Sequence, residues 1–178
     1  SHAQRGVTFR DWTPRKDQGQ ARMTDLEIRP AQGQDADALG EVMFDAIHKG
    51  VSKYTEAQRA AWQSSPNSGA KWAQRLAQQD VWMAVEAGTA LAFLTLRNDG
   101  YVDMAFVRGE AQGRGLFRRL YQMLEKSAQD AGHGRLWTHA SLMAQPAFLA
   151  VGFRVIRHES VARLGETLDR AEMEKALQ

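Results

Sequence analysis

The chain has 178 residues, 43% of them hydrophobic and 25% charged, and carries a formal net charge of +2 at pH 7. This composition is that of one ordinary globular domain, and the absence of cysteine excludes a disulfide framework and a thiolate metal site. No apolar run approaches the roughly 18 residues of a membrane-spanning helix, and no secretory signal is visible, so we expect a cytoplasmic protein without a membrane partner.

The positive charge is concentrated in the first 22 residues. Residues 1–22 hold five basic and two acidic side chains, a net of +3, so residues 23–178 carry −1 of the whole-chain +2. A globular part that is not basic argues against a nucleic-acid partner. Ser1 and His2 resemble the remnant of an expression tag, and the rest of this stretch lacks helical or strand periodicity. We therefore predict a flexible N-terminal extension, residues 1–22, followed by one domain, residues 23–178.

The first half of the domain predicts one strand and three helices. Apolar and charged residues alternate over residues 26–30, and Pro30 ends this half-buried strand. We expect Asp35 to cap the helix that follows, in which apolar residues recur at spacings of three and four. Two shorter helices are expected over residues 55–63 and 70–79, separated by a stretch rich in serine, proline and glycine.

The second half predicts a three-stranded meander, two helices and a closing hairpin. The meander is antiparallel, because its strands are joined by tight turns, and a helix then leads to a strand that runs parallel to the last of them. Pro146 opens a short helix before the hairpin. The predicted strands cover residues 81–86, 91–97, 101–107, 135–140, 153–161 and 168–177, and the longer helix covers residues 114–131.

A turn with two glycines joins the strand of residues 101–107 to the long helix. Gly113 and Gly115 allow a tight turn and leave no Cβ to block a ligand that approaches the main chain. The first N–H groups of the helix point the same way and favour an anion. Arginines at positions 114, 118 and 119 are unfavourable for an isolated helix N-terminus, which is easier to understand if an anion binds there.

Two common phosphate-binding motifs do not account for this turn. A dinucleotide fingerprint requires a third glycine at position 118, where the chain has arginine, and no Gly-Lys-Ser/Thr phosphate loop is present. A plain strand-to-helix turn with solvated arginines remains the alternative to an anion site.

The segment Gln112–Phe117 resembles the (Gln/Arg)-x-x-Gly-x-(Gly/Ala) signature of the GNAT N-acetyltransferases, although Phe117 stands where that family usually has glycine or alanine. The resemblance implies an α+β fold from Leu26 onward, with a mixed, mostly antiparallel central sheet of about seven strands flanked by helices. It also implies acetyl-CoA as cosubstrate and a small-molecule or peptide amine as acceptor. Monomer and homodimer both remain open.

The resemblance further implies which residues bind the cosubstrate. In the family, backbone amides of the turn hold the pyrophosphate, and a backbone N–H of the preceding strand, here at Phe106 or Val107, holds the thioester carbonyl. The implied set is Ala105, Phe106, Val107, Gln112, Gly113, Arg114, Gly115, Leu116, Phe117, Arg118 and Phe148.

Three side chains are candidates for proton transfer. Asp103 interrupts the strand of residues 101–107, where a carboxylate is costly unless it is paired or faces a cleft, so it is the first candidate for a general base. His139 and Ser141, at the end of the next strand, are the alternatives. Each of the three also fits an ordinary structural role. The family's usual acid is a tyrosine, and its position here holds Phe148, which cannot donate a proton.

The acceptor pocket of the family is shaped by the first helices, which here carry Tyr54, Trp62 and Trp72. These aromatic side chains could hold an organic amine, but aromatic residues at helical spacing also pack in cores. The sequence thus predicts an N-acetyltransferase. A non-catalytic acyl-CoA-binding module of the same fold is the alternative.

Overall fold

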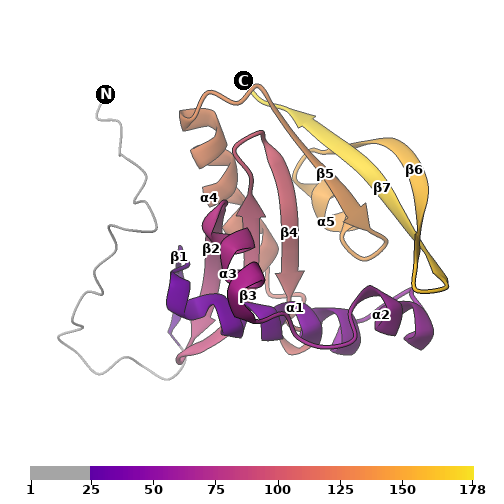
Figure 1. Ribbon diagram of the computed structural model, residues 1–178. Coiled ribbons are helices and arrows are strands. Elements are labelled where there is room, and N and C mark those ends of the chain that lie inside the picture. Colours follow the sequence, from indigo (N-terminus) through magenta and orange to yellow (C-terminus); the bar gives the residue numbers. More distant parts are fainter. Residues whose placement is uncertain (1–24) are drawn as a thin grey trace.

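The computed structural model describes residues 25–178, and the predicted extension of residues 1–22 lies outside the described residues. A seven-stranded sheet in the order β1-β2-β3-β4-β5-β7-β6 runs through the molecule (Figure 1). Its strands are β1 (Leu26–Pro30), β2 (Asp80–Glu86), β3 (Thr89–Leu96), β4 (Tyr101–Val107), β5 (Arg135–Ser141), β6 (Arg154–Arg163) and β7 (Glu166–Ala176). All neighbouring pairs are antiparallel except β4 and β5, which confirms the predicted mixed sheet.

Helices cover both faces of the sheet. They are α1 (Ala36–Lys49), α2 (Glu56–Trp62), α3 (Gly69–Ala77), α4 (Leu116–Asp130) and α5 (Gln145–Ala150), with short 3-10 turns at Gly33–Asp35 and Gly109–Ala111. The apolar stripe of α4 forms one core with β2, β3 and β5, and α1 and α3 form a second core on the opposite face. Strand β3 lies between these cores and is buried at every position after Thr89, as expected for a strand covered on both sides.

The predicted order of elements is confirmed, and the differences lie at element ends. Helix α4 begins at Leu116 rather than at Arg114, because Gly115 adopts the left-handed conformation, with φ of 76°, and cannot start a right-handed helix. Asp35 occupies the predicted N-cap position of α1, but its side chain makes no capping hydrogen bond within residues 25–178. Its carboxylate instead accepts hydrogen bonds from the Arg29 guanidinium and from the Gln32 N–H.

A β-bulge in β4 separates this strand from β5. Thr95 of β3 faces Met104 and Leu96 faces Val102, so Asp103 is an extra residue on β4. The Met104 N–H donates to the Thr95 hydroxyl, 3.0 Å away, instead of continuing the ladder toward β5. Only Tyr101 and Val102 pair with β5, and beyond them the two strands are no longer paired.

The bulge also decides which backbone groups face β5. The Arg108 N–H donates to the Leu91 carbonyl of β3. Successive residues of an antiparallel strand direct their backbone N–H groups toward opposite neighbouring strands. The Phe106 N–H therefore also faces β3, whereas the N–H groups of Ala105 and Val107 face the gap between β4 and β5.

Replacing Thr95 with valine tests the bulge. Thr95 is fully buried, so Thr95→Val leaves the Met104 N–H without its acceptor and should lower the free energy of unfolding by about 1–3 kcal/mol in urea titrations. Thr89→Val, at the exposed start of the same strand, should change it by less than about 0.5 kcal/mol. Equal effects would show that the Thr95 hydroxyl does not hold the bulge.

Candidate active site

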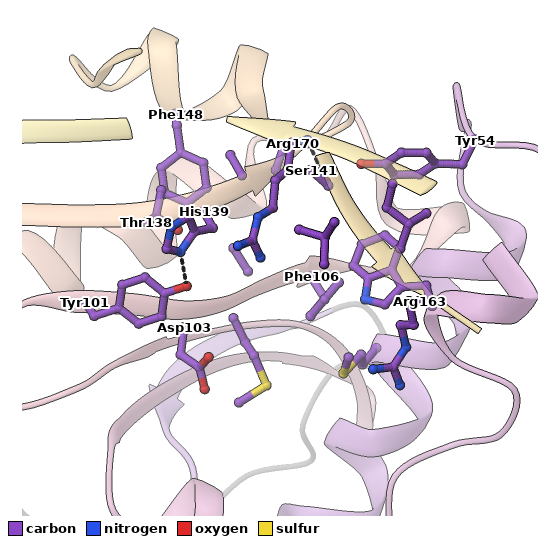
Figure 2. A pocket seen from close by; sticks show the side chains of 18 of the residues that line it. Tyr54, Tyr101, Asp103, Phe106, Thr138, His139, Ser141, Phe148, Arg163 and Arg170 are labelled. Carbon is purple, nitrogen blue, oxygen red and sulfur yellow. Dashed lines mark hydrogen bonds between the residues drawn. The ribbon is translucent and has the colours of Figure 1, made fainter. Parts of the chain in front are cut away.

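Two cavities open where β4 and β5 separate. The first, which we call the turn cavity, has a volume of about 430 Å³ and reaches from β4 to the two-glycine turn and α5. The second, the hairpin cavity, has a volume of about 300 Å³ and lies between β4, β5 and the β6–β7 hairpin (Figure 2). Both are lined by Trp62, Ala105, Phe106, Ser141 and Ala144, so they are adjoining parts of one cleft.

The turn before α4 is open to a ligand. Gly113 and Gly115 have φ angles of 80° and 76°, and a Cβ on either would meet no atom of the described residues within 4 Å. No side chain of residues 25–178 caps α4, and its first turn holds no acidic residue, so its first N–H groups are available to an anion. These features fit the sequence prediction of an anion site, and both glycines line the turn cavity together with Gln112, Leu116 and Phe117.

The predicted arginines of the turn have partners on the protein. Arg114 forms an ion pair with Glu86 at 2.5 Å, which lowers the pKa of the Glu86 carboxyl. Arg118 donates to the Ala150 carbonyl at 3.4 Å. Neither arginine lines either cavity. The backbone N–H groups of the turn are therefore better placed than these side chains to bind an anion.

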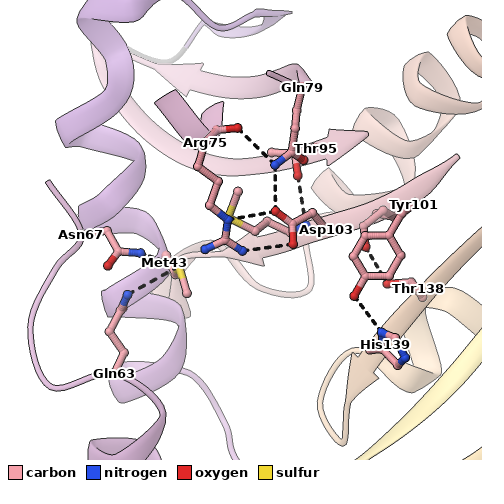
Figure 3. A network of polar contacts seen from close by, with 12 residues as sticks. Met43, Gln63, Asn67, Arg75, Gln79, Thr95, Tyr101, Asp103, Thr138 and His139 are labelled. Carbon is pink, nitrogen blue, oxygen red and sulfur yellow. Dashed lines mark hydrogen bonds and ion pairs between the residues drawn. The ribbon is translucent and has the colours of Figure 1, made fainter. Parts of the chain in front are cut away.

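Asp103 lines the hairpin cavity, but its carboxylate is already occupied (Figure 3). Arg75 donates to both oxygens at 3.0 Å, and the Gln79 side-chain amide donates to Oδ2 at 2.8 Å. A carboxylate that accepts three hydrogen bonds, two of them from a guanidinium, has few acceptor positions left for a substrate amine. This arrangement disfavours Asp103 as the first candidate for a general base.

His139 lies in the same cavity in a more suitable setting (Figure 2). The Tyr101 hydroxyl is 2.8 Å from Nδ1, and Nε2 is 3.6 Å from a Glu159 carboxylate oxygen. Burial lowers the pKa of the imidazole, and the nearby Arg170 lowers it further, although Glu159 opposes the shift. The lowered pKa favours the neutral form of His139, which is able to accept a proton.

Ser141 and Phe148 occupy different parts of the cleft. Ser141 lines both cavities, and its oxygen accepts the Ala144 N–H at 3.2 Å, which leaves its O–H without an acceptor among residues 25–178. Phe148 is buried against Phe117 and Phe153, with ring centroids 5.1 and 4.9 Å away. It lines the hairpin cavity and not the turn cavity, whereas the family resemblance implied that Phe148 belongs to the cosubstrate site.

The three predicted acceptor aromatics are not all in the cleft. Tyr54 lines the hairpin cavity, and its hydroxyl donates to the Asp169 carbonyl and accepts the Leu142 N–H. Trp62 lines both cavities. Trp72 lines neither, because it is packed between α1, α3 and β3, where its indole N–H donates to the Ala36 carbonyl at 2.7 Å.

Sequence reasoning missed five polar side chains that line the hairpin cavity, Arg75, Tyr101, Thr138, Arg163 and Arg170. Tyr101 reaches it from β4, and Arg163 and Arg170 reach it from the β6–β7 hairpin. Glu159 faces Arg170 across the hairpin, and a period of two then places Arg163 and Arg170 on one face. That alternation is visible in the sequence, but which face meets the cleft is decided by the pairing of β7 with β5.

The fold and the cleft belong to a known family. Residues 50–176 match the model of the acetyltransferase (GNAT) domain, which is most of the chain. The protein is a member of the GNAT acetyltransferase family.

Solved structures have the same fold. A GCN5-related N-acetyltransferase from Rhodopseudomonas palustris is 29% identical, with a TM-score of 0.79 over 89% of this chain and all of its own. A putative acetyltransferase from Salmonella typhimurium, solved with acetyl-CoA, is 20% identical, with a TM-score of 0.61 over 87% of this chain and 95% of its own. PaiA N-acetyltransferase from Thermoplasma acidophilum, solved with coenzyme A, is 17% identical, with a TM-score of 0.65 over 86% and 99%.

No curated protein matches the sequence. Among residues 25–178, no helix is long and apolar enough to cross a membrane.

The position of Trp72 gives a stability prediction. Trp72→Phe removes the donor of the buried Ala36 carbonyl, so the free energy of unfolding should fall by about 1–3 kcal/mol. Trp62→Phe is the matched control, because the Trp62 indole N–H has no hydrogen-bond partner among the described residues, and it should cost less. Urea unfolding of both variants measures the difference, and a larger loss for Trp62→Phe would contradict this assignment.

Proposed function

We propose that the protein transfers the acetyl group of acetyl-CoA to an amine of a small molecule or peptide. The observation that carries this proposal is the open two-glycine turn at the start of α4, which faces a cleft bounded by the unpaired edge of β4. Membership in the GNAT family supports it, as do the neighbours that were solved with acetyl-CoA and coenzyme A.

The turn and the β4 edge would divide the cosubstrate between them. N–H groups at Gly113, Gly115 and the first turn of α4 hold the pyrophosphate, and the turn cavity holds the pantetheine arm. The N–H groups of Ala105 and Val107 face the gap and can hydrogen-bond to the arm and to the thioester carbonyl. Val107 is therefore a better holder of the carbonyl than Phe106, whose N–H faces β3.

His139 is the general base in this proposal, and Tyr101 connects it to the amine. If Nε2 carries the hydrogen, it faces the Glu159 carboxylate, and Nδ1 is free to accept the Tyr101 O–H. As the amine attacks the thioester, its proton passes to the Tyr101 oxygen while the Tyr101 proton passes to His139. The imidazolium that forms is then stabilised by Glu159.

Proton return to the coenzyme A sulfur falls to Ser141 or to water. Ser141 is at the junction of the two cavities and its O–H is not used by the described residues. A thiol with a pKa near ~8.5 leaves without much assistance near neutral pH. Phe148 therefore need not prevent turnover, although it is the feature that favours the alternative of a non-catalytic acyl-CoA-binding module.

Substitution of the turn glycines tests the cosubstrate site. Gly115→Val should abolish binding of acetyl-CoA measured by calorimetry, because a side chain would stand where the phosphates approach the backbone. Gly88→Val is the matched control, since Gly88 has φ of 78°, also faces open space and lies in the β2–β3 turn. Each should cost about 1–2 kcal/mol of stability through backbone strain. Equal affinities in the two variants would overturn the site.

The pH dependence of turnover tests the base. Because the pKa of His139 is lowered, the base is active above this pKa, and kcat/KM should fall with an acidic limb below pH ~6.5. His139→Gln should remove this limb and lower kcat roughly 100-fold to 10,000-fold, measured as thiol release from acetyl-CoA with saturating amine. Tyr101→Phe should cost as much, and the double variant no more.

Asp103→Asn is the comparison for this assignment. It should keep the acidic limb, because the Asp103 carboxylate is engaged by Arg75 and Gln79. Loss of the limb in Asp103→Asn, with its retention in His139→Gln, would return the base to Asp103. Binding of acetyl-CoA without thiol release for any amine would favour the non-catalytic module.

A further inference from the structure

One face of the β6–β7 hairpin forms a wall of the hairpin cavity, and it carries two arginines. Val161 faces Leu168 across the hairpin, and both line the cavity between Arg163 at the tip and Arg170 nearer to β5. Figure 2 shows Arg163 and Arg170 reaching the cavity from the hairpin. The wall is thus an apolar pair flanked by two guanidinium groups.

These guanidinium groups keep donors available for a ligand. Arg163 uses its Nε to bind the Ala61 carbonyl at 2.7 Å, and Arg170 uses its Nε to bind Glu159 at 2.7 Å. Among residues 25–178, their Nη groups have no hydrogen-bond partner, and Arg163 has no carboxylate partner. A guanidinium fastened through Nε has its remaining donors held in place for a carboxylate or phosphate.

The charged side chains that line the hairpin cavity also favour an anionic ligand. Three arginines and one carboxylate line it, and the carboxylate, Asp103, is paired with Arg75. Glu159 compensates part of the Arg170 charge, and Glu166 lies opposite Arg163 on the hairpin without forming an ion pair with it. Such a cavity repels an acceptor that carries only ammonium charge and attracts one that also carries an anionic group.

We infer that the acceptor is a small amine that also carries an anionic group, a carboxylate or a phosphate, held by Arg163 and Arg170. This inference rests on the proposed acetyl transfer. The remaining lining includes Met43, Trp62 and Phe106, so the body of the acceptor is apolar, as in an aliphatic amino acid.

The test measures binding of products, so that it does not depend on turnover. The protein saturated with coenzyme A is titrated by calorimetry with N-acetylleucine and N-acetylleucinamide, and separately with N-acetylphosphoethanolamine and N-acetylethanolamine. Each pair differs in the anionic group. We expect the anionic member of at least one pair to bind about tenfold tighter or more, as for a charge-assisted hydrogen bond. The pair that shows this preference distinguishes a carboxylate from a phosphate.

Variants of the hairpin assign the preference to its residues. Arg163→Gln and Arg170→Gln should each reduce the anionic member's affinity about fivefold or more and leave the neutral member's affinity unchanged. Arg163→Lys, which keeps the charge, should retain part of the preference. Arg157→Gln is the matched control, because Arg157 is on β6, pairs with Glu172 and lines neither cavity. Its affinities should equal those of the unmodified protein.

Three results of the binding experiments would overturn the inference. The first is equal or tighter binding of the neutral member in both pairs. The second is no binding of any of the four compounds to the protein loaded with coenzyme A. The third is a preference for the anionic member that is retained in both glutamine variants. Thiol release with leucinamide or spermidine but not with leucine would also overturn it, while acetyl transfer itself would stand. Absence of thiol release with every amine would instead count against the proposed function.

Discussion

The pairing of β4 with β5 ends after Tyr101 and Val102, and the cleft depends on this early end. In an uninterrupted sheet the backbone groups of the second half of β4 would be bonded to β5, and no ligand could enter. The bulge at Asp103 prevents this, because it turns the Met104 N–H toward the Thr95 hydroxyl of β3. The same extra residue leaves the N–H groups of Ala105 and Val107 facing the gap. One bulge thus opens the cleft between β4 and β5 and provides the N–H donors along its edge.

The two ends of the cleft are built from different parts of the chain. The turn cavity is built from neighbouring segments of the sequence. Strand β4, the two-glycine turn and α4 follow one another directly and place the helix N-terminus beside this cavity. The hairpin cavity depends on segments that are far apart in the sequence. The β6–β7 hairpin is held beside β5 through β7, and it is tied to α2 by the bond from Arg163 to the Ala61 carbonyl. This division fits a site in which a common cosubstrate is bound by a local motif and the acceptor by parts of the chain that can vary independently.

The sequence predicted what depends on local pattern. Alternation, helical spacing and turn residues were sufficient for the strands, the helices and the parallel crossover to β5, and the two-glycine turn identified the family. It could not show that Asp103 is engaged by Arg75, because that contact joins residues 28 positions apart, on α3 and β4. Trp72 and Trp62 look alike in sequence, and only packing shows that one is buried in the core while the other borders the cleft. The role of the hairpin arginines was missed for the same reason, since the β7–β5 pairing that presents them is also long-range.

The proposed base and the proposed acceptor site interact through Arg170. Burial lowers the pKa of His139 and this arginine lowers it further, which favours the neutral imidazole before the acceptor binds. An anionic group bound to the Arg170 guanidinium would offset that positive charge, and the protonated form of His139 would become less unfavourable. The pKa of His139 would then rise when the acceptor is in place. Because proton transfer becomes easier as the pKa of the base approaches the working pH, His139 would be a stronger base with a correctly bound acceptor than with one that lacks the anionic group. The same contact that selects the acceptor would therefore also promote its deprotonation.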